Sequence, residues 1–274
     1  MKNYSILLLF VTLIFSSSCK DSNKQNLGDK SIFSGTMVEM NWLDIKKAAN
    51  SNTVILLPVT VIEEHGPHLD LSTDVYLTLI PCKIIKTELE KRGIKCLIAP
   101  PFYWGINGET KLFPGSFNVK PSTFLALIQD IAENLDAWGF KHIYCINLHG
   151  DDSHLENLKI ATNKIRNELK IEIYDVATLP VPEIIPPKPE FSANLHNDFH
   201  AGANETSAMW YYFPDKVDVE KALTLPPQLD FEPLGYCGDP ALFKTDGKGK
   251  EIVEFVAAFT TNQIIDHLKT YSPE

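Results

Sequence analysis

Residues 53–59 read TVILLPV, and the polar stretch EEHGPH follows at residues 63–68. The first stretch is apolar or β-branched throughout, which indicates a strand that is buried on both faces. Strands of this kind belong to parallel sheets, in which ligands bind beyond the carboxyl ends of the strands. The acids and histidines of residues 63–68 therefore stand where a parallel sheet carries its chemistry.

Strand-like and helix-like segments alternate along the rest of the chain. Further strands are predicted at residues 95–100, 142–147 and 171–176. Helices are predicted at residues 75–89, 121–138, 154–169 and 252–268, with Pro81 expected to kink or interrupt the first of them. This alternation predicts a three-layer α/β/α fold with a mainly parallel central sheet. Residues 178–193, rich in Pro and Glu, are expected to form a long loop.

The composition is that of an ordinary globular protein. The chain has 274 residues, of which 44% are hydrophobic and 22% are charged, and its formal net charge is −10. No cluster of Lys or Arg offers a surface for a phosphate backbone, so nucleic acid is not an expected partner. We expect one large folded domain over residues 33–274.

The first residues have the pattern of an export signal. Lys2 precedes an apolar run at residues 6–15, and three serines then lead to Cys19. The run is shorter than the roughly 20 residues that a membrane-spanning helix needs, so it predicts a signal peptide at residues 1–18. Small residues directly before a cysteine resemble a bacterial lipobox, which implies cleavage before Cys19 and its acylation. A secreted protein with a chance cysteine is the alternative.

On this interpretation, residues 19–32 are the lipidated cysteine and a flexible tether, because residues 20–31 are polar and lack apolar periodicity. The membrane would be contacted through Cys19. The expected location is the bacterial cell envelope, on the periplasmic or outer-membrane side.

Four further cysteines have no CxxC spacing: Cys82, Cys96, Cys145 and Cys237. An oxidising compartment permits disulfides, but the sequence does not determine how these four would pair. Buried free thiols are the expected state.

Two more polar clusters accompany the one at residues 63–68. The third predicted strand is followed by NLHGDD at residues 147–152, and HNDFHAGANETS at residues 196–207 precedes a short apolar segment. Neutral imidazoles and carboxylates together are the ligand set for zinc and manganese. Their placement at converging strand ends favours a metal site.

Each of these residues alone has a simpler explanation. Asp74 suits a helix N-cap, His149 suits a hydrogen-bonded core histidine, and Glu205 suits the first turn of a helix. His68 is expected to be structural, and Glu64 is expected to face solvent. The metal hypothesis therefore depends on several residues meeting in one place.

Five motifs, in order, resemble the creatininase (creatinine amidohydrolase) family. ILLPVTVIEEHGPHLDLSTD, at residues 55–74, is similar to the family segment around E-x-H-G-P-H-L-P-x-x-T-D, and NLHGDD stands where the family has N-x-H-G. The other three matches are FPGSF, HAGANETS and GYCGDPALFKTDGKGKEI, which resemble F-P-G-T-x, H-A-G-x-x-E-T-S and the closing G-x-x-G-D-P segment. The resemblance implies a creatininase-like fold.

The resemblance also implies two divalent metal ions, Zn²⁺ and/or Mn²⁺, with Fe²⁺ as a further option. Glu63 and His65 would each contribute to one metal, Asp74 would bridge both, and His149 and a later carboxylate would complete the pair. Either Glu205 or Asp151 fills that last place, and Glu205 is preferred.

Two metal ions about 3.5 to 4 Å apart can lower the pKa of a shared water and polarise a carbonyl oxygen. The resemblance thus implies hydrolysis of a C–N bond in a small cyclic amide, amide or formamide through a metal-bound hydroxide. His200 would serve as general acid or base, or would orient a metal-bound carboxylate; Asp151 is the second candidate catalytic residue.

Other functions stay open beside this one. Metal-assisted ring opening of a cyclic ketone or sugar derivative suits the same groups, and a lipoprotein that binds a metal or ligand without turnover is the rival from another class. The resemblance further implies a homo-oligomer, often a hexamer. Thr60 and Val61 depart from the family pattern and put creatinine itself in doubt as substrate. Extra acids at Asp70, Asp151 and Asp152 suggest a cationic or polyhydroxylated substrate.

Overall fold

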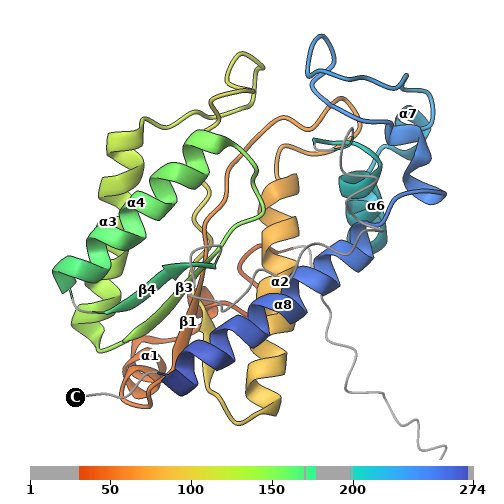
Figure 1. The fold of residues 1–274 in the computed structure, drawn as a ribbon. Coiled ribbons are helices and arrows are strands. Elements are labelled where there is room, and N and C mark those ends of the chain that lie inside the picture. The colour runs from red at the N-terminus through yellow and green to blue at the C-terminus, as the bar shows by residue number, and fades with distance from the viewer. Residues whose placement is uncertain (1–30, 170, 177–197, 199, 271–274) are drawn as a thin grey trace, which may run out of the picture.

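The computed structural model describes residues 31–169, 171–176, 198 and 200–270. Its central sheet has four parallel strands in the order β2-β1-β3-β4 (Figure 1). The strands are β1 Val54–Pro58, β2 Cys96–Ile98, β3 His142–Ile146 and β4 Glu172–Asp175. All four stand within the segments that the sequence predicts, so the parallel α/β prediction is confirmed.

Helices cover both faces of this sheet and form the outer layers. Figure 1 shows α3 (Pro121–Trp138) and α4 (Asp152–Leu169) on one side of the strands, and α2 (Thr73–Lys91) and α8 (Gly249–Thr270) on the other. The strands are buried at every position of β1 and β3. The expected three layers are therefore present, and strand runs without polar alternation are explained by burial on both sides.

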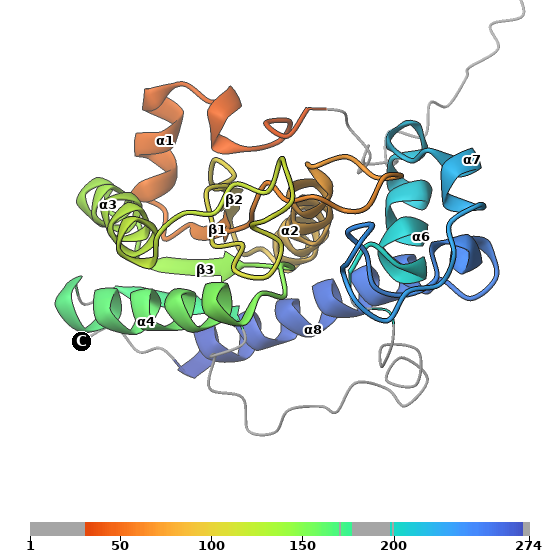
Figure 2. The ribbon, with the colours of Figure 1, turned by 90° about the horizontal axis from the view of Figure 1, so that it is seen from above.

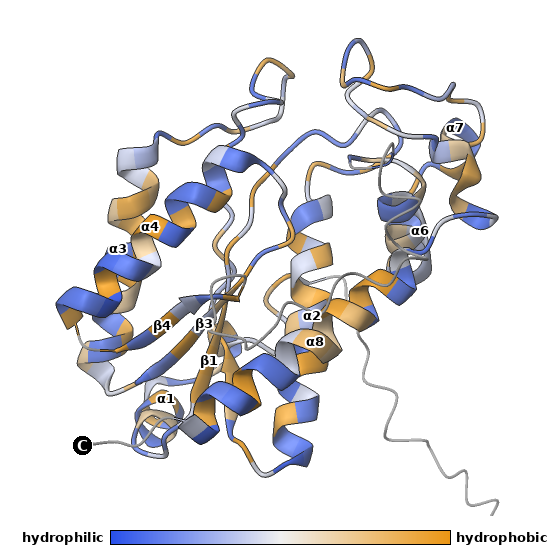
Figure 3. Ribbon diagram, viewed as in Figure 1, coloured by the Kyte–Doolittle hydropathy of each residue, from blue (hydrophilic) through white to orange (hydrophobic). Residues whose placement is uncertain are grey.

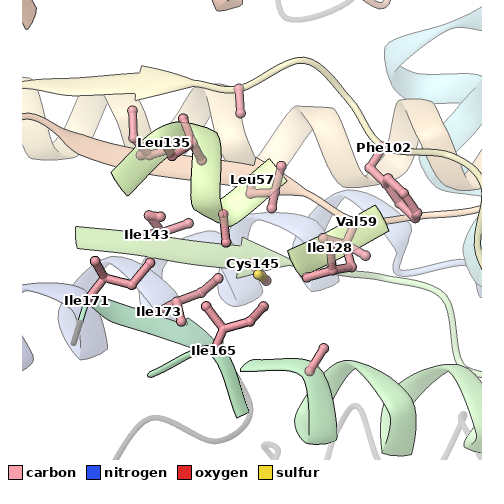
Figure 4. Packing of buried hydrophobic residues seen from close by; sticks show 14 of the residues in the cluster. Leu57, Val59, Phe102, Ile128, Leu135, Ile143, Cys145, Ile165, Ile171 and Ile173 are labelled. Atoms are coloured by element: carbon pink, nitrogen blue, oxygen red, sulfur yellow. The ribbon is translucent and has the colours of Figure 1, made fainter. Parts of the chain in front are cut away.

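Successive strand residues point to opposite layers. Ile55 and Leu57 of β1 join a cluster with α3 and α4, whereas Leu56 joins a cluster with α2 and α8. Figure 4 shows the first cluster, in which Ile128 of α3 and Ile165 of α4 approach the strand side chains. Figure 3 shows β1 as an apolar strand, whereas hydrophobic and hydrophilic residues alternate along helices α3, α4 and α8.

The helix ends follow local sequence signals. Helix α2 is not interrupted at Pro81, contrary to one of the two expectations for it. Its last residue is Lys91, which is followed by the C-cap Arg92 and by Gly93, with φ +77°. Helix α3 begins with Pro121 at its first position and ends at Trp138, followed by the C-cap Gly139 in the left-handed region. These signals explain why the predicted and observed bounds of α3 agree.

The other helices within the described residues are short. They comprise α1 (Trp42–Ala49), α6 (Ala203–Tyr212), α7 (Val219–Ala222) and the 3₁₀ turns η1 (Met37–Glu39), η3 (Pro214–Lys216) and η4 (Pro240–Lys244). Helix α6 packs on α8, and both ribbon views place α6 and α7 on the far side of α2 from α3 (Figure 2). Helix α1 was not predicted. Helix α6 covers the start of the short apolar segment expected after residue 207, but it begins earlier, at Ala203, inside the polar cluster.

Some sequence predictions lie outside the described residues. These are the signal peptide, Cys19 with most of its tether, and the long loop at residues 178–193. Within the described part of the chain, no helix has the length and apolar character needed to cross a membrane. Cys82, Cys96, Cys145 and Cys237 are all free and buried, which confirms the expected thiols.

Candidate metal centre

The predicted ligands converge beyond the carboxyl ends of the central strands. Glu63 and His65 lie in the segment after β1, His149 lies in the turn after β3, and Asp74 and Glu205 lie in the first turns of α2 and α6. The first four are almost fully buried, with exposed fractions of 3%, 1%, 5% and 2% for Glu63, His65, His149 and Asp74. Buried acids and histidines at this edge fit the ligand position of a parallel sheet.

Asp74 lies at the centre of the cluster. One of its carboxylate oxygens is 3.2 Å from Nε2 of His65, and the other is 3.1 Å from Nδ1 of His149. The same Nδ1 atom is 3.1 Å from a Glu63 oxygen, while Nε2 of His65 is 3.7 Å from a Glu205 oxygen. The donor atoms thus form two groups that share Asp74, namely Glu63–Asp74–His149 and His65–Asp74–Glu205.

The other nitrogen of each ring is held by a backbone carbonyl. Nε2 of His149 lies 2.9 Å from the Ile106 carbonyl oxygen, and Nδ1 of His65 lies 3.2 Å from that of Glu63. A carbonyl oxygen only accepts, so each of these nitrogens carries the hydrogen and the opposite nitrogen faces the carboxylates. Metal-binding histidines commonly have this arrangement.

The carboxylates of the cluster favour positive charge on the neighbouring histidines. Burial lowers the pKa of His65, but Asp74, Glu205 and Glu63 outweigh that effect and raise it to about 10. Burial also lowers the pKa of His149, but hydrogen bonds with Asp74 and Glu63 outweigh this effect and raise the pKa to about 11. Buried charges need a partner or a metal. Three carboxylates beside neutral imidazoles match the charge and the donor chemistry of divalent zinc or manganese.

His200 and Glu64 adjoin this cluster. The ring of His200 lies 4.4 Å from that of His65, centroid to centroid, and one of its nitrogens groups with Glu63 and His65. Nε2 of His200 is 2.9 Å from the Glu64 carbonyl oxygen and 3.4 Å from a Glu64 carboxylate oxygen. Burial and His65 lower the pKa of His200, but the Glu64 bond and the other acids raise it overall. The expectation that Glu64 faces solvent is wrong, because it is 7% exposed.

Asp151 has different contacts from Glu205. Its carboxylate accepts hydrogen bonds from the backbone N–H groups of Gly108 (2.8 Å), Glu109 (3.2 Å) and His154 (3.0 Å). The last bond is the pattern of a helix N-cap at the start of α4. Within the described residues, Asp151 belongs to none of the groups whose donor atoms could share an ion. The structure thus brings Glu205, not Asp151, to His65 and Asp74.

The family model of creatininase, described as creatinine amidohydrolase, matches residues 38–264. This chain belongs to the creatininase family. It is 27% identical over 212 residues to creatinine amidohydrolase of Pseudomonas putida, across 72% of this chain and 78% of that protein. It is also 27% identical over 241 residues to the mycofactocin precursor peptide peptidase of Mycolicibacterium smegmatis, across 81% and 86% of the two chains.

A solved creatininase variant complexed with creatine shares the fold, with a TM-score of 0.64 at 21% identity across 87% of this chain and 99% of that one. As a member of the creatininase family, this protein is an enzyme, namely a metal-dependent amidohydrolase. The predicted creatininase-like fold is thereby confirmed.

Two contacts of this creatininase-family site were not predicted from the sequence. The Thr110 hydroxyl donates a hydrogen bond to a Glu63 oxygen, and the Ile106 carbonyl accepts one from His149. Both residues belong to a loop without regular structure. Every residue has a backbone carbonyl, so the residue type at position 106 does not reveal this contact. Asp70 was expected to favour a cationic or polyhydroxylated substrate, but it forms an exposed ion pair with Lys216 at 2.9 Å. Its charge is therefore already matched.

Replacing Glu205 and Asp151 by their amides separates their roles. If each of the two donor groups holds one ion, Glu205→Gln is expected to lower the metal content of this creatininase-family enzyme by about one ion per chain, because only one of the two groups contains Glu205. Asp151→Asn is the comparison variant. Its single amide oxygen replaces only one of the two accepting carboxylate oxygens, so it is expected to loosen either the α4 cap or the bonds from Gly108 and Glu109 and to weaken metal affinity. It is still expected to hold both ions at saturating Zn²⁺, because Asp151 belongs to neither donor group. Metal analysis of both purified variants checks this, and loss from Asp151→Asn alone would reverse the assignment.

Proposed function

We propose that this protein hydrolyses a C–N bond in a small cyclic amide, amide or formamide, with two divalent metal ions held by Glu63, His65, Asp74, His149 and Glu205. The observation that carries the proposal is the position of Asp74, whose two oxygens face His65 and His149 in two adjoining donor groups. A shared carboxylate between two such groups is suited to a pair of ions.

The protein's own residues would fix the geometry of this pair. Thr110 holds one Glu63 oxygen by hydrogen bonding, and the Ile106 and Glu63 carbonyls hold the rings of His149 and His65. These bonds leave one nitrogen of each ring directed at the carboxylates. Rings and acids held in advance keep the ligand geometry without reorganisation.

We assign proton transfer to His200. Its Nε2 atom donates to the Glu64 carbonyl and lies near the Glu64 carboxylate, which stabilises the ring when it carries a second proton. His200 lies against His65, so a proton held on its ring is next to the donor groups. It would deliver that proton to the leaving nitrogen as the C–N bond breaks.

Two divalent ions, when bound, supply a Lewis acid for the carbonyl oxygen of the substrate and activate a water. We propose Zn²⁺ or Mn²⁺ from the nitrogen and oxygen donors. Support comes from solved creatininases described as a manganese form and as a Zn-Zn form, which share this fold at TM-scores of 0.59 and 0.57.

A short peptide is the second candidate substrate. The mycobacterial relative named as a peptide peptidase matches a larger share of this chain than the creatinine amidohydrolase does. Hydrolysis of a peptide bond also breaks a C–N bond, so the same residues serve both reactions. Ring opening of a cyclic ketone or sugar derivative remains the further enzyme alternative.

We also propose attachment to the cell envelope through a lipidated Cys19 and assembly into a homo-oligomer. The first rests on the signal-like residues 1–18, and the second on the family resemblance. Mass spectrometry of the mature protein tests the first: a diacylated or triacylated Cys19 supports it, and an unmodified chain that keeps residues 1–18 contradicts it.

Turnover by the metal-loaded protein tests the proposed reaction. The panel would contain creatinine, other lactams, formamides, primary amides and short peptides, each followed by release of amine or acid. We expect hydrolysis of at least one class, its loss after chelation, and its return when Zn²⁺ or Mn²⁺ is added back. Bound metal without turnover of any compound would instead indicate a ligand-binding protein.

A further inference from the structure

The loop at residues 105–110 contacts the candidate metal centre at two points. The Ile106 carbonyl accepts the hydrogen on Nε2 of His149 at 2.9 Å, and the Thr110 hydroxyl donates to Glu63. His149 and Glu63 belong to the same donor group with Asp74. The position of this loop therefore sets the orientation of two of the three groups around one proposed ion.

The first turn of α4 holds the loop from its other side. Nδ1 of His154 accepts a hydrogen bond from the Ile106 N–H at 3.2 Å, and Asp151 accepts from Gly108 and Glu109. Both backbone polar groups of Ile106 are thus hydrogen-bonded: its N–H donates to His154, and its carbonyl oxygen accepts from His149. The loop links α4 to the donor group.

The His154 side chain is tightly confined. It has no exposed surface, and its ring packs against His149 at 5.0 Å and against Phe124 at 4.9 Å between centroids. A Cβ atom on Gly105 would lie 2.5 Å from the ring, so the backbone approaches it as closely as glycine permits. This confinement fixes the ring and with it the acceptor that Ile106 uses.

Retaining a histidine at this position has a cost. Because Nδ1 accepts from Ile106, Nε2 carries the hydrogen, and that atom is buried with no hydrogen-bond partner among the described residues. An unsatisfied buried donor destabilises a fold, and an apolar side chain would avoid it. The acceptor at Nδ1 is the property that distinguishes histidine here from an apolar residue of similar size.

We propose that His154 is a positioning residue for the metal centre, acting through Ile106, whose N–H it holds and whose carbonyl orients His149. The proposal rests on the proposed function in one respect, namely that His149 is a metal ligand. His154 itself touches neither substrate nor metal in this account.

Two variants of similar size separate hydrogen bonding from packing. His154→Leu removes the acceptor, whereas His154→Gln keeps an oxygen that can accept from Ile106. Phe124→Leu is the matched control, since it alters packing against the same ring without removing the bond. His154→Met replaces the leucine variant if that protein does not fold, because methionine fills irregular space.

The measurements are the Zn²⁺ dissociation constant, by chelator competition on the full-length protein, and hydrogen exchange of the Ile106 amide in the metal-free protein. His154→Leu is expected to weaken Zn²⁺ binding by roughly 10- to 100-fold and to speed Ile106 exchange. His154→Gln is expected to restore most of both, and Phe124→Leu to leave the Ile106 amide protected.

Equal losses in the leucine and glutamine variants, or unchanged affinity in the leucine variant, would overturn the positioning role and leave the proposed function standing. A wild-type protein that binds no Zn²⁺ or Mn²⁺ would overturn the proposed function, and the positioning role with it. The two failures are therefore distinguishable.

Discussion

Asp74→Ala is expected to remove both proposed metal ions and to lower hydrolysis by about a thousandfold or more, because the two ions would supply several kcal/mol to the reaction and each 1.4 kcal/mol is tenfold in rate. Its two oxygens face His65 and His149, so no other side chain in the described residues serves both donor groups. Metal analysis by mass spectrometry and a turnover assay on the same sample check the result.

Asp70→Ala is the control for this prediction. Asp70 is near Asp74 in sequence, but it is half-exposed and pairs with Lys216 at the surface. Surface ion pairs contribute little to stability, so this variant is expected to keep its metal content and its activity. Retention of both ions by Asp74→Ala would show that Asp74 is not shared between them.

Metal binding is expected to release about two protons per chain near neutral pH. The pKa of His65 is raised to about 10 and that of His149 to about 11 in the metal-free protein, chiefly because Asp74 and neighbouring acids outweigh the effect of burial. Neutral pH lies below both pKa values, so both rings carry a second proton that ligation must displace. Above the higher pKa the release should disappear.

Calorimetric titration with Zn²⁺ in buffers of different ionisation enthalpy measures this release directly. The slope of observed enthalpy against buffer ionisation enthalpy gives the number of protons. His149→Ala should reduce the release by about one proton, because only His65 then has to lose one. Binding without proton release would mean that neither histidine is a ligand.

The sequence predicts the sheet and the major helices because their signals are local. The unbroken apolar run at β1 and the mostly apolar segment at β3 favour burial between two helical layers, and Pro121 and Gly139 mark the ends of α3. Helix α1 was not predicted, although local signals for it exist: Asn41 caps its first turn, and Ile45, Ala48 and Ala49 pack on the core. Its eight residues make only about two turns, which is a short stretch for a helical pattern.

The site is predictable only where residue type carries the chemistry. Glu63, His65, Asp74, His149 and Glu205 are recognisable as acids and histidines after strands, and the structure gathers them. Burial of Glu64 depends on a distant segment, since a Cβ on Gly235 would lie 2.0 Å from its carboxylate oxygen. The Ile106 carbonyl and the acceptor at His154 depend on tertiary contacts that no spacing encodes.

The two-metal centre is the central claim, and anomalous diffraction from crystals of the protein loaded with Zn²⁺ tests it most directly. We predict two anomalous peaks about 3.5 to 4 Å apart, one beside Glu63 and His149, the other beside His65 and Glu205, with Asp74 between them. A single peak, or peaks away from Asp74, would contradict the account.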